Sequence, residues 1–141
     1  MSDSYDLKRF VDAQNAHGTY DAAVAELRRG RKTSHWMWFV FPQIAGLGRS
    51  EMSRRFAISS LEEAKAYLEH PVLGPRLREC ADLVAQTHGQ SAEQIFGGID
   101  AQKLQSSMTL FLRAAPDEPL FQQVLDQYFG GQSDSATDQR L

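Results

Sequence analysis

A run of six consecutive apolar residues, 36–41, constrains the fold of this chain more than any other feature of its sequence. It contains both tryptophans and two of the eight phenylalanines, and Pro42 follows it directly. A run of this length is compatible with a buried strand or with a buried helical turn. Pro42 disfavours the helical conformation for Phe41, so any helix ends there. Because no other segment alternates convincingly between apolar and polar residues, a strand would have no partner, and we expect a short helix.

Start and stop signals for helices occur along the rest of the chain. Ser60 and Ser91 each open a capping box, with a Glu or Gln three residues later. Gly30 and Gly130 follow apolar stripes of helical spacing and are typical of helix ends. Since connections are of ordinary length and no repeat is visible, these signals predict an all-α fold, a single compact multihelical domain of about seven short helices.

Length and composition indicate one domain. The chain has 141 residues, of which 42% are hydrophobic and 23% charged, close to the averages of globular proteins. We expect a globular domain over residues 1–131 and a frayed C-terminal tail over residues 132–141, where large apolar side chains are absent until the last position. The single cysteine, Cys80, rules out an internal disulfide and fits a reducing compartment. Because we see neither a signal peptide nor an apolar run long enough to span a membrane, we predict a cytoplasmic protein.

Basic residues are concentrated in one part of the chain. The net charge is −3, yet residues 28–55 contain seven Lys or Arg against one acid, Glu51, a local charge of +6 that leaves −9 for the rest. Such segregation creates a positive potential that can attract an anion. The alternative is that these side chains are solvated and spread over the surface once the chain folds. The overall negative charge argues against nucleic-acid binding.

Several catalytic and cofactor motifs have no counterpart in the sequence. The four histidines are scattered, and neither His-Glu-x-x-His nor Cys-x-x-Cys occurs, so we expect no metal site. There is no Gly-x-Ser-x-Gly motif and no phosphate-binding loop. The glycines at 46 and 48 supply only the first two of a dinucleotide-binding fingerprint. We therefore predict no cofactor, and we interpret Cys80, which lies on an apolar helical stripe, as an inert core thiol.

Polar residues on both sides of the apolar run predict an anion site. His35 can exchange protons near neutral pH, and the side chains of Lys32 and Arg49 suit a phosphate or carboxylate. If Ser34 caps a helix, the free N–H groups after it add to that site. The tryptophan faces can stack on a base or a cation. The alternative is structural, because aromatic side chains at this density are more often part of a core.

Two adjacent serines lie with Lys103 inside an otherwise apolar helix. Serine is a poor helix former, so these side chains either allow close helix packing, which we favour, or present hydroxyls to a ligand. The candidate site then has His35 as the catalytic residue, no metal ligand, and the following ligand-binding residues: Lys32, Trp36, Trp38, Gln43, Arg49, Ser106 and Ser107.

Several blocks of the sequence resemble a known bacterial family. These blocks are residues 31–43, with His-Trp-Met-Trp-Phe, residues 46–50, residues 70–77, residues 95–97, residues 103–111, with Ser-Ser-Met-Thr-Leu-Phe, and residues 128–131. Over about residues 7–131 the chain is similar to the domain-of-unknown-function 1810 family, whose members are sometimes labelled calpastatin. The resemblance implies a compact all-α domain and no established activity, cofactor or catalytic residue. Gln105 departs from the family's pattern, in which we expect an arginine.

Two functional hypotheses follow. The first is a domain that binds an anionic, nucleotide-like small molecule. Hydrolysis of an N-glycosidic or phosphoester bond is the reaction open to it, and His35 is the only general acid or base we can name. That composite site is lost if His35 lies more than a side chain's reach from Ser106. The alternative is a non-catalytic protein-interaction module that docks an acidic partner on residues 28–55. Neither hypothesis involves a membrane.

Overall fold

Helices account for all regular structure in residues 4–141, the part of the chain that the computed structural model describes, apart from one isolated β-bridge. This confirms the predicted all-α fold. Ten α-helices occur in this part, more than the seven or so expected, because four of them have only four or five residues. The longer helices are α1 (Lys8–Asn15), α2 (Thr19–Arg29), α5 (Leu61–Glu69), α6 (Leu73–Gln86), α8 (Gly98–Ala114) and α9 (Pro119–Phe129). The short ones are α3 (Met37–Val40), α4 (Glu51–Arg55), α7 (Ala92–Phe96) and α10 (Ser135–Asp138), and a 3-10 turn, η1 (Ala16–Gly18), joins α1 to α2.

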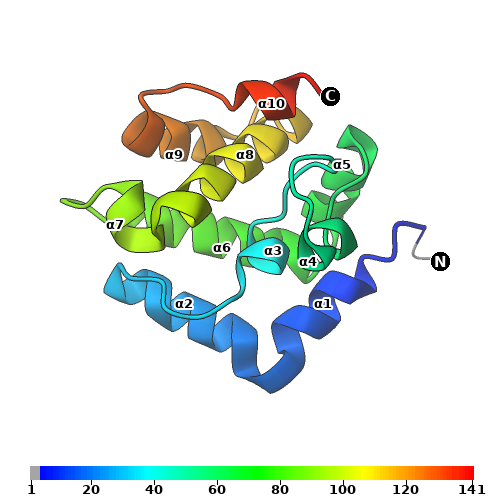
Figure 1. Ribbon diagram of the computed structural model, residues 1–141, viewed down its shortest axis with the longest axis horizontal. Coiled ribbons are helices and arrows are strands. Elements are labelled where there is room, and N and C mark those ends of the chain that lie inside the picture. The colour runs from blue at the N-terminus through cyan, green and yellow to red at the C-terminus, as the bar shows by residue number, and fades with distance from the viewer. Residues whose placement is uncertain (1–3) are drawn as a thin grey trace.

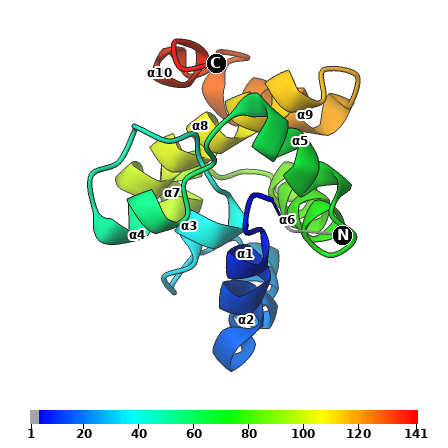
Figure 2. The ribbon, with the colours of Figure 1, turned by 90° about the vertical axis from the view of Figure 1, so that its right-hand side faces the viewer.

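Helix α8 is the centre of the packing. Figures 1 and 2 show α1 and α2 on one side of the molecule, α6 across the middle, and α8, α9 and α10 on the opposite side. Helix α8 packs against α5, α7, α9 and α10, while α6 packs against α2, α5 and α9. The N-terminal half of α8 faces the segment between α3 and α4, where the hollows described below lie. None of the helices in residues 4–141 is long and apolar enough to cross a membrane.

The aromatic run forms the short helix that we predicted. Helix α3 lies in the middle of the run, with Trp36 and Phe41 flanking it. Both flanking residues are fully buried and meet Phe96 of α7 in a cluster whose ring centroids are 6.2–6.4 Å apart. Burial of such a side chain stabilises the fold by roughly 1.5–3 kcal/mol. Most of the run is therefore core, and the partly buried Trp38 is the exception.

The segment of residues 44–58, which we call the 44–58 loop, is closed at its own base. Ile44 and Ile58 pair in an isolated parallel bridge, and both side chains are buried. The N–H of Ile58 donates to the carbonyl oxygen of Gln43, and the N–H of Ala45 donates to that of Ile58, both at 2.8 Å. The bridge attaches the ends of the loop to the core, while much of the part between them, including α4, is exposed.

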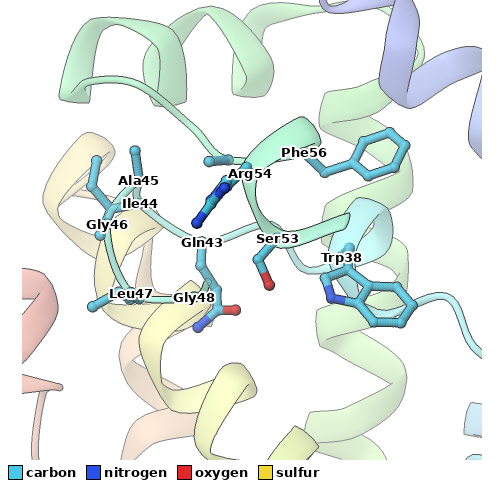
Figure 3. A pocket seen from close by; sticks show the side chains of 11 residues that line it. Trp38, Gln43, Ile44, Ala45, Gly46, Leu47, Gly48, Ser53, Arg54 and Phe56 are labelled. Atoms are coloured by element: carbon cyan, nitrogen blue, oxygen red, sulfur yellow. The ribbon is translucent and has the colours of Figure 1, made fainter. Parts of the chain in front are cut away.

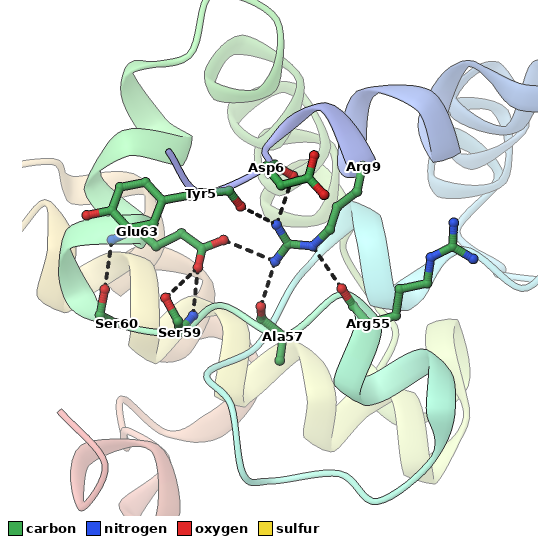
Figure 4. Close-up of polar contacts among 8 residues, drawn as sticks. All are labelled: Tyr5, Asp6, Arg9, Arg55, Ala57, Ser59, Ser60 and Glu63. Carbon is green, nitrogen blue, oxygen red and sulfur yellow. Dashed lines mark hydrogen bonds and ion pairs between the residues drawn. The ribbon is translucent and has the colours of Figure 1, made fainter. Parts of the chain in front are cut away.

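Arg9 connects α1 to the end of this loop (Figure 4). Its guanidinium donates to the carbonyl oxygens of Arg55 and Ala57, both at 2.8 Å. It also forms an ion pair of 3.1 Å with Glu63 of α5, whose side chain is almost completely buried. One arginine thus holds three segments together at the place where the loop returns to the core.

The two predicted capping boxes differ in the structure. The box at Ser91 is complete, with both reciprocal hydrogen bonds formed. At Ser60 only half is formed: its hydroxyl accepts from the N–H of Glu63 at 3.1 Å. The Glu63 carboxylate instead accepts from the N–H and hydroxyl of Ser59 and pairs with Arg9. The ion pair across the fold therefore replaces the local contact.

Residues 132–141, for which we predicted a frayed tail, contain α10 instead. Asp134 caps this helix by accepting from the N–H of Thr137 at 3.0 Å and from its hydroxyl at 2.6 Å. Arg113 of α8 pairs with Asp138 at 2.9 Å. The prediction considered only large apolar side chains, whereas polar contacts hold this segment. The structure is therefore ordered on both sides of residue 131, where we expected the domain to end. Residues 1–3 of the expected domain lie outside the described part.

Candidate functional site

The segment before α3 binds a carboxylate of the protein itself. Ser34 does not cap α3, so the N–H groups after it do not form the anion site that we expected. Glu26 of α2 is 4% exposed and accepts hydrogen bonds from the N–H groups of Thr33 and Ser34 at 2.7 and 2.9 Å. It also accepts from the hydroxyl of Ser34 at 2.6 Å and from Nε1 of Trp36 at 3.0 Å. Burial would raise the pKa of Glu26, but these hydrogen bonds outweigh burial and lower the pKa to about 2. The carboxylate therefore stays ionised and organises the segment before α3.

Two of the predicted ligand-binding residues have no access to a ligand. The side chain of Trp36 is fully buried, and its indole nitrogen is bonded to Glu26. Ser107 is fully buried as well, and its hydroxyl has no hydrogen-bond partner within residues 4–141. Both side chains are part of the core, as the structural alternative held. Any stacking wall is therefore the other tryptophan, Trp38.

His35 and Lys32 line a shallow hollow of about 370 Å³ at the start of α8. His35 is exposed, whereas the Lys32 side chain is only 7% exposed because it forms an ion pair of 2.8 Å with Asp100. Ser106 lines a different hollow, and Ile99 is the residue common to both. The predicted combination of His35 with Ser106 therefore does not form a single pocket.

A smaller hollow of about 150 Å³ lies between α3 and the 44–58 loop (Figure 3). Trp38, Gln43 and Arg54 line it, and within the described residues none of these side chains has a hydrogen-bond or ion-pair partner. Nε1 of Trp38 is buried, and an unsatisfied buried donor costs about 1–3 kcal/mol. Figure 3 shows this nitrogen, the Gln43 amide and the Ser53 hydroxyl around one opening. The hollow thus contains more hydrogen-bonding capacity than the protein itself uses.

A second hollow, of about 270 Å³, adjoins the first. The two share four residues of the α3–α4 segment: Gln43, Leu47, Gly48 and Ser53. The opposite wall is one face of α8, with side chains at helical spacing: Ile99, Gln102, Lys103 and Ser106. Ile99 is 77% exposed, which is unusual for a large apolar side chain. We call the two hollows together the Trp38 groove.

Local contacts shape the second hollow. The hydroxyl of Ser106 lies 3.2 Å from the carbonyl oxygen of Gln102 and 3.1 Å from the carboxylate of Asp134, which also lines this hollow. On the other wall, a Cβ on Gly48 would lie 2.5 Å from both Cβ and Oγ of Ser53. Gly48 is therefore a glycine because the loop folds tightly onto α4, not because it belongs to a dinucleotide fingerprint.

The basic residues of the 28–55 segment do not converge on one site. Arg49, a predicted anion ligand, is exposed and lies outside both hollows of the Trp38 groove. The other basic residues that line hollows are distributed over four separate ones: Arg28 with Arg29, then Lys32, Arg54 and Arg55. Clustering in the sequence is thus largely lost on folding, as the alternative interpretation held, and Arg54 alone brings its charge to the groove.

Sequence reasoning missed three residues of this region. Ser53 and Arg54 lie on α4 and Asp100 lies in the first turn of α8, and none of the three was among the predicted site residues. In the structure Asp100 pairs with Lys32 at 2.8 Å and with Lys103 at 3.4 Å. The available signal was the helical spacing of polar residues along the start of α8, which marks a face that does not enter the core.

Comparisons with known proteins find a family of unknown function and a solved structure of a hypothetical protein. The profile of a family described as "Protein of unknown function (DUF1810)" matches residues 4–141. The chain is 55% identical to the conserved hypothetical protein Rv1873 from Mycobacterium tuberculosis, and the two structures agree with a TM-score of 0.95 over 99% of this chain and 98% of that one. No curated protein matches the chain.

Proposed function

We propose that this chain, which belongs to the DUF1810 family of proteins of unknown function, binds a small anionic molecule in the Trp38 groove. One observation carries the proposal: three side chains with unused hydrogen-bonding atoms, Trp38, Gln43 and Arg54, line the same small hollow. Only Nε1 of Trp38 is buried among these atoms. Buried polar atoms normally have partners, so a ligand that reaches this nitrogen would supply the missing partner and would also meet the more exposed Gln43 and Arg54. The donors without a partner also indicate which chemical groups the ligand carries.

The chemistry of these side chains indicates an anion with additional acceptor atoms. Arg54 presents a planar, permanently charged fork that suits a phosphate or carboxylate. Nε1 of Trp38 only donates, so it requires an acceptor, while the amide of Gln43 can do either. A nucleotide-like molecule combines an anionic group with ring and carbonyl acceptors. The adjoining second hollow provides the additional space for such a molecule.

Hydrolysis is a narrower proposal that depends on His35. This side chain lies outside the groove, in the shallow hollow that has Trp38 in common with the first. It is the general acid or base that we propose for cleavage of an N-glycosidic or phosphoester bond. Replacement of His35 by Ala is then expected to abolish turnover while the affinity for the ligand stays unchanged.

A second candidate function is the docking of an acidic protein. It is supported by an open hollow of about 470 Å³ at the end of α2, lined by the exposed residues Arg28, Arg29 and His88. We place either function in the bacterial cytoplasm, because the single cysteine, Cys80, is buried and unpaired and the relative of known structure comes from a bacterium.

A thermal-shift screen with nucleotides and sugar phosphates tests the binding proposal. A ligand at millimolar concentration is expected to raise the melting temperature of the wild type, because binding to the native state alone stabilises it. Arg54→Gln is expected to lose this shift. The matched control is Arg49→Gln, since Arg49 is exposed and outside the groove. If no compound stabilises the wild type, or if both variants keep the full shift, the binding proposal is wrong and docking of an acidic partner is favoured.

A further inference from the structure

Asp100 pairs with two lysines, and each lysine lies over a tryptophan ring. Nζ of Lys32 is 2.8 Å from the Asp100 carboxylate and 5.0 Å from the ring centroid of Trp36. Nζ of Lys103 is 3.4 Å from the same carboxylate and 4.9 Å from the ring centroid of Trp38. Each lysine thus has the same two kinds of neighbour, the Asp100 carboxylate and an indole ring, but the strength of its contacts differs.

Lys32 is held firmly, whereas Lys103 is not. The Lys32 side chain is 7% exposed and also donates to the carbonyl oxygen of Ser34 at 2.5 Å. The Lys103 side chain is 22% exposed, and its distance to Asp100 is longer than the roughly 2.7–2.9 Å of a good charge-assisted hydrogen bond. If Lys103 turns away, Asp100 keeps its short ion pair with Lys32. Movement of Lys103 therefore leaves no charge unpaired.

Lys103 is also placed where an incoming anion would meet it. It lines the second hollow of the Trp38 groove and is the only cationic side chain among the described residues that do so. The one acid in this lining, Asp134, already accepts three hydrogen bonds, from the hydroxyl of Ser106 and from the N–H and hydroxyl of Thr137. These donors are uncharged, so the Asp134 carboxylate keeps its negative charge, although one of its oxygens already has three partners. Lys103 is the positive charge that this hollow offers to an anion.

We propose that Lys103 binds the acidic group of the ligand and that Asp100 is its internal counter-ion, which the ligand replaces. The movement of Lys103 then uncovers one face of Trp38 for a planar part of the same ligand. This inference rests on the proposed function and narrows it to an aromatic phosphate or carboxylate. It also makes Asp100 a positioning residue that lowers the affinity, because every anion competes with its carboxylate.

Isothermal titration with phenyl phosphate and inorganic phosphate tests this arrangement. Lys103→Met is expected to weaken phenyl phosphate binding about tenfold or more, since a hydrogen bond from a charged donor is lost. Asp100→Asn is expected to strengthen it about two- to fivefold, because the competing ion pair disappears while an acceptor remains for Lys32. Trp38→Leu should remove the preference for phenyl phosphate over inorganic phosphate. The control is Lys65→Met, an exposed lysine of α5, which should bind as the wild type does.

The outcomes separate this inference from the proposed function. If Arg54→Gln abolishes binding but Lys103→Met does not, the role of Lys103 is overturned and the groove remains a binding site. If neither the wild type nor Asp100→Asn binds either probe, both the inference and the proposed function fail for this class of ligand. If only Asp100→Asn binds, its carboxylate is confirmed as the competitor. If Asp100→Asn does not fold, the role of Lys103 is tested by the other pair of variants: it is supported if Lys103→Met binds phenyl phosphate more weakly than Lys65→Met, and overturned if the two bind equally.

Discussion

Trp36 and Trp38 stand two residues apart in one apolar run, and the fold uses them in opposite ways. Trp36 is fully buried, and its indole nitrogen donates to Glu26 at 3.0 Å. Trp38 is partly exposed, and its buried indole nitrogen has no partner within residues 4–141. A lysine lies over each ring, so the lysines do not account for the difference. It lies in whether the hydrogen-bonding atoms around the ring are satisfied by the protein.

This difference separates a structural site from a candidate binding site. Around Trp36 the donors and the carboxylate match, and nothing remains for a ligand to contact. Around Trp38 the donors exceed the acceptors, and a hollow adjoins them. An unsatisfied group costs stability, and such a cost is typical of sites that are completed by a partner. The following changes are expected to affect the two tryptophans unequally.

The largest effect is expected from Glu26→Ala. It removes the acceptor for two backbone N–H groups, one hydroxyl and the indole of Trp36, so we expect the free energy of unfolding to fall by about 4 kcal/mol. Urea denaturation followed by circular dichroism measures this loss. The control is Glu69→Ala, an exposed acid at the end of α5, for which we expect less than about 0.5 kcal/mol. Equal losses in the two variants would show that Glu26 does not organise the Trp36 side.

Acid is expected to weaken the Trp36 side before the chain as a whole unfolds. The pKa of Glu26 is lowered from its ordinary 4.5 to about 2, so the unfolded chain binds this proton first as the pH falls. The stabilisation by ionised Glu26 is complete above pH 4.5 and is lost as the pH falls toward 2. The loss in the free energy of unfolding is about 2 kcal/mol at pH 3 and about 3 kcal/mol below pH 2. Subtracting the stability profile of Glu26→Gln isolates this contribution. A difference that does not vary across this range would contradict the low pKa.

Replacing each tryptophan by phenylalanine compares the two sites directly. Trp36→Phe loses packing and leaves Glu26 with one donor fewer, so we expect a cost of about 2 kcal/mol. Trp38→Phe removes a donor that is already unsatisfied, so its cost should stay below about 1 kcal/mol. Ligand binding should show the reverse order and weaken only for Trp38→Phe. If Trp38→Phe were the more destabilising variant, the distinction between the two sites would be lost.

The lysines are expected to show the same contrast on a smaller scale. Lys32→Met breaks a buried ion pair that Lys103 only partly replaces, and we expect a loss of about 1–2 kcal/mol. Lys103→Met breaks the longer and more exposed pair and should cost about 0.5 kcal/mol or less. Thermal unfolding at low and high salt measures both losses. The smaller loss should diminish with salt, because exposed charges are screened more strongly than buried ones.

The sequence predicts the helices better than it predicts the groove, for a physical reason. Helix ends depend on residues within one turn, so the complete capping box at Ser91 could be recognised from four residues. The exposure of Trp38 depends on what α8 and the 44–58 loop place beside it, and the apolar run itself does not reveal this. The N–H groups that bind an anion are those of Thr33 and Ser34, not the groups after Ser34 that we expected. Their anion is Glu26, and that pairing depends on how α2 leads into the segment before α3.

The bridge between Ile44 and Ile58 has a consequence for how this family can diversify. A loop whose two ends are joined to each other transmits little of its internal change to the rest of the fold. Substitutions and length changes in its exposed part, residues 45–50, alter one wall of the groove. Residues 55–57 are different, because Arg9 binds their carbonyl groups and Phe56 packs in the core. The exposed part of the segment is therefore the wall of the groove whose sequence can change at the least cost to the helices behind it.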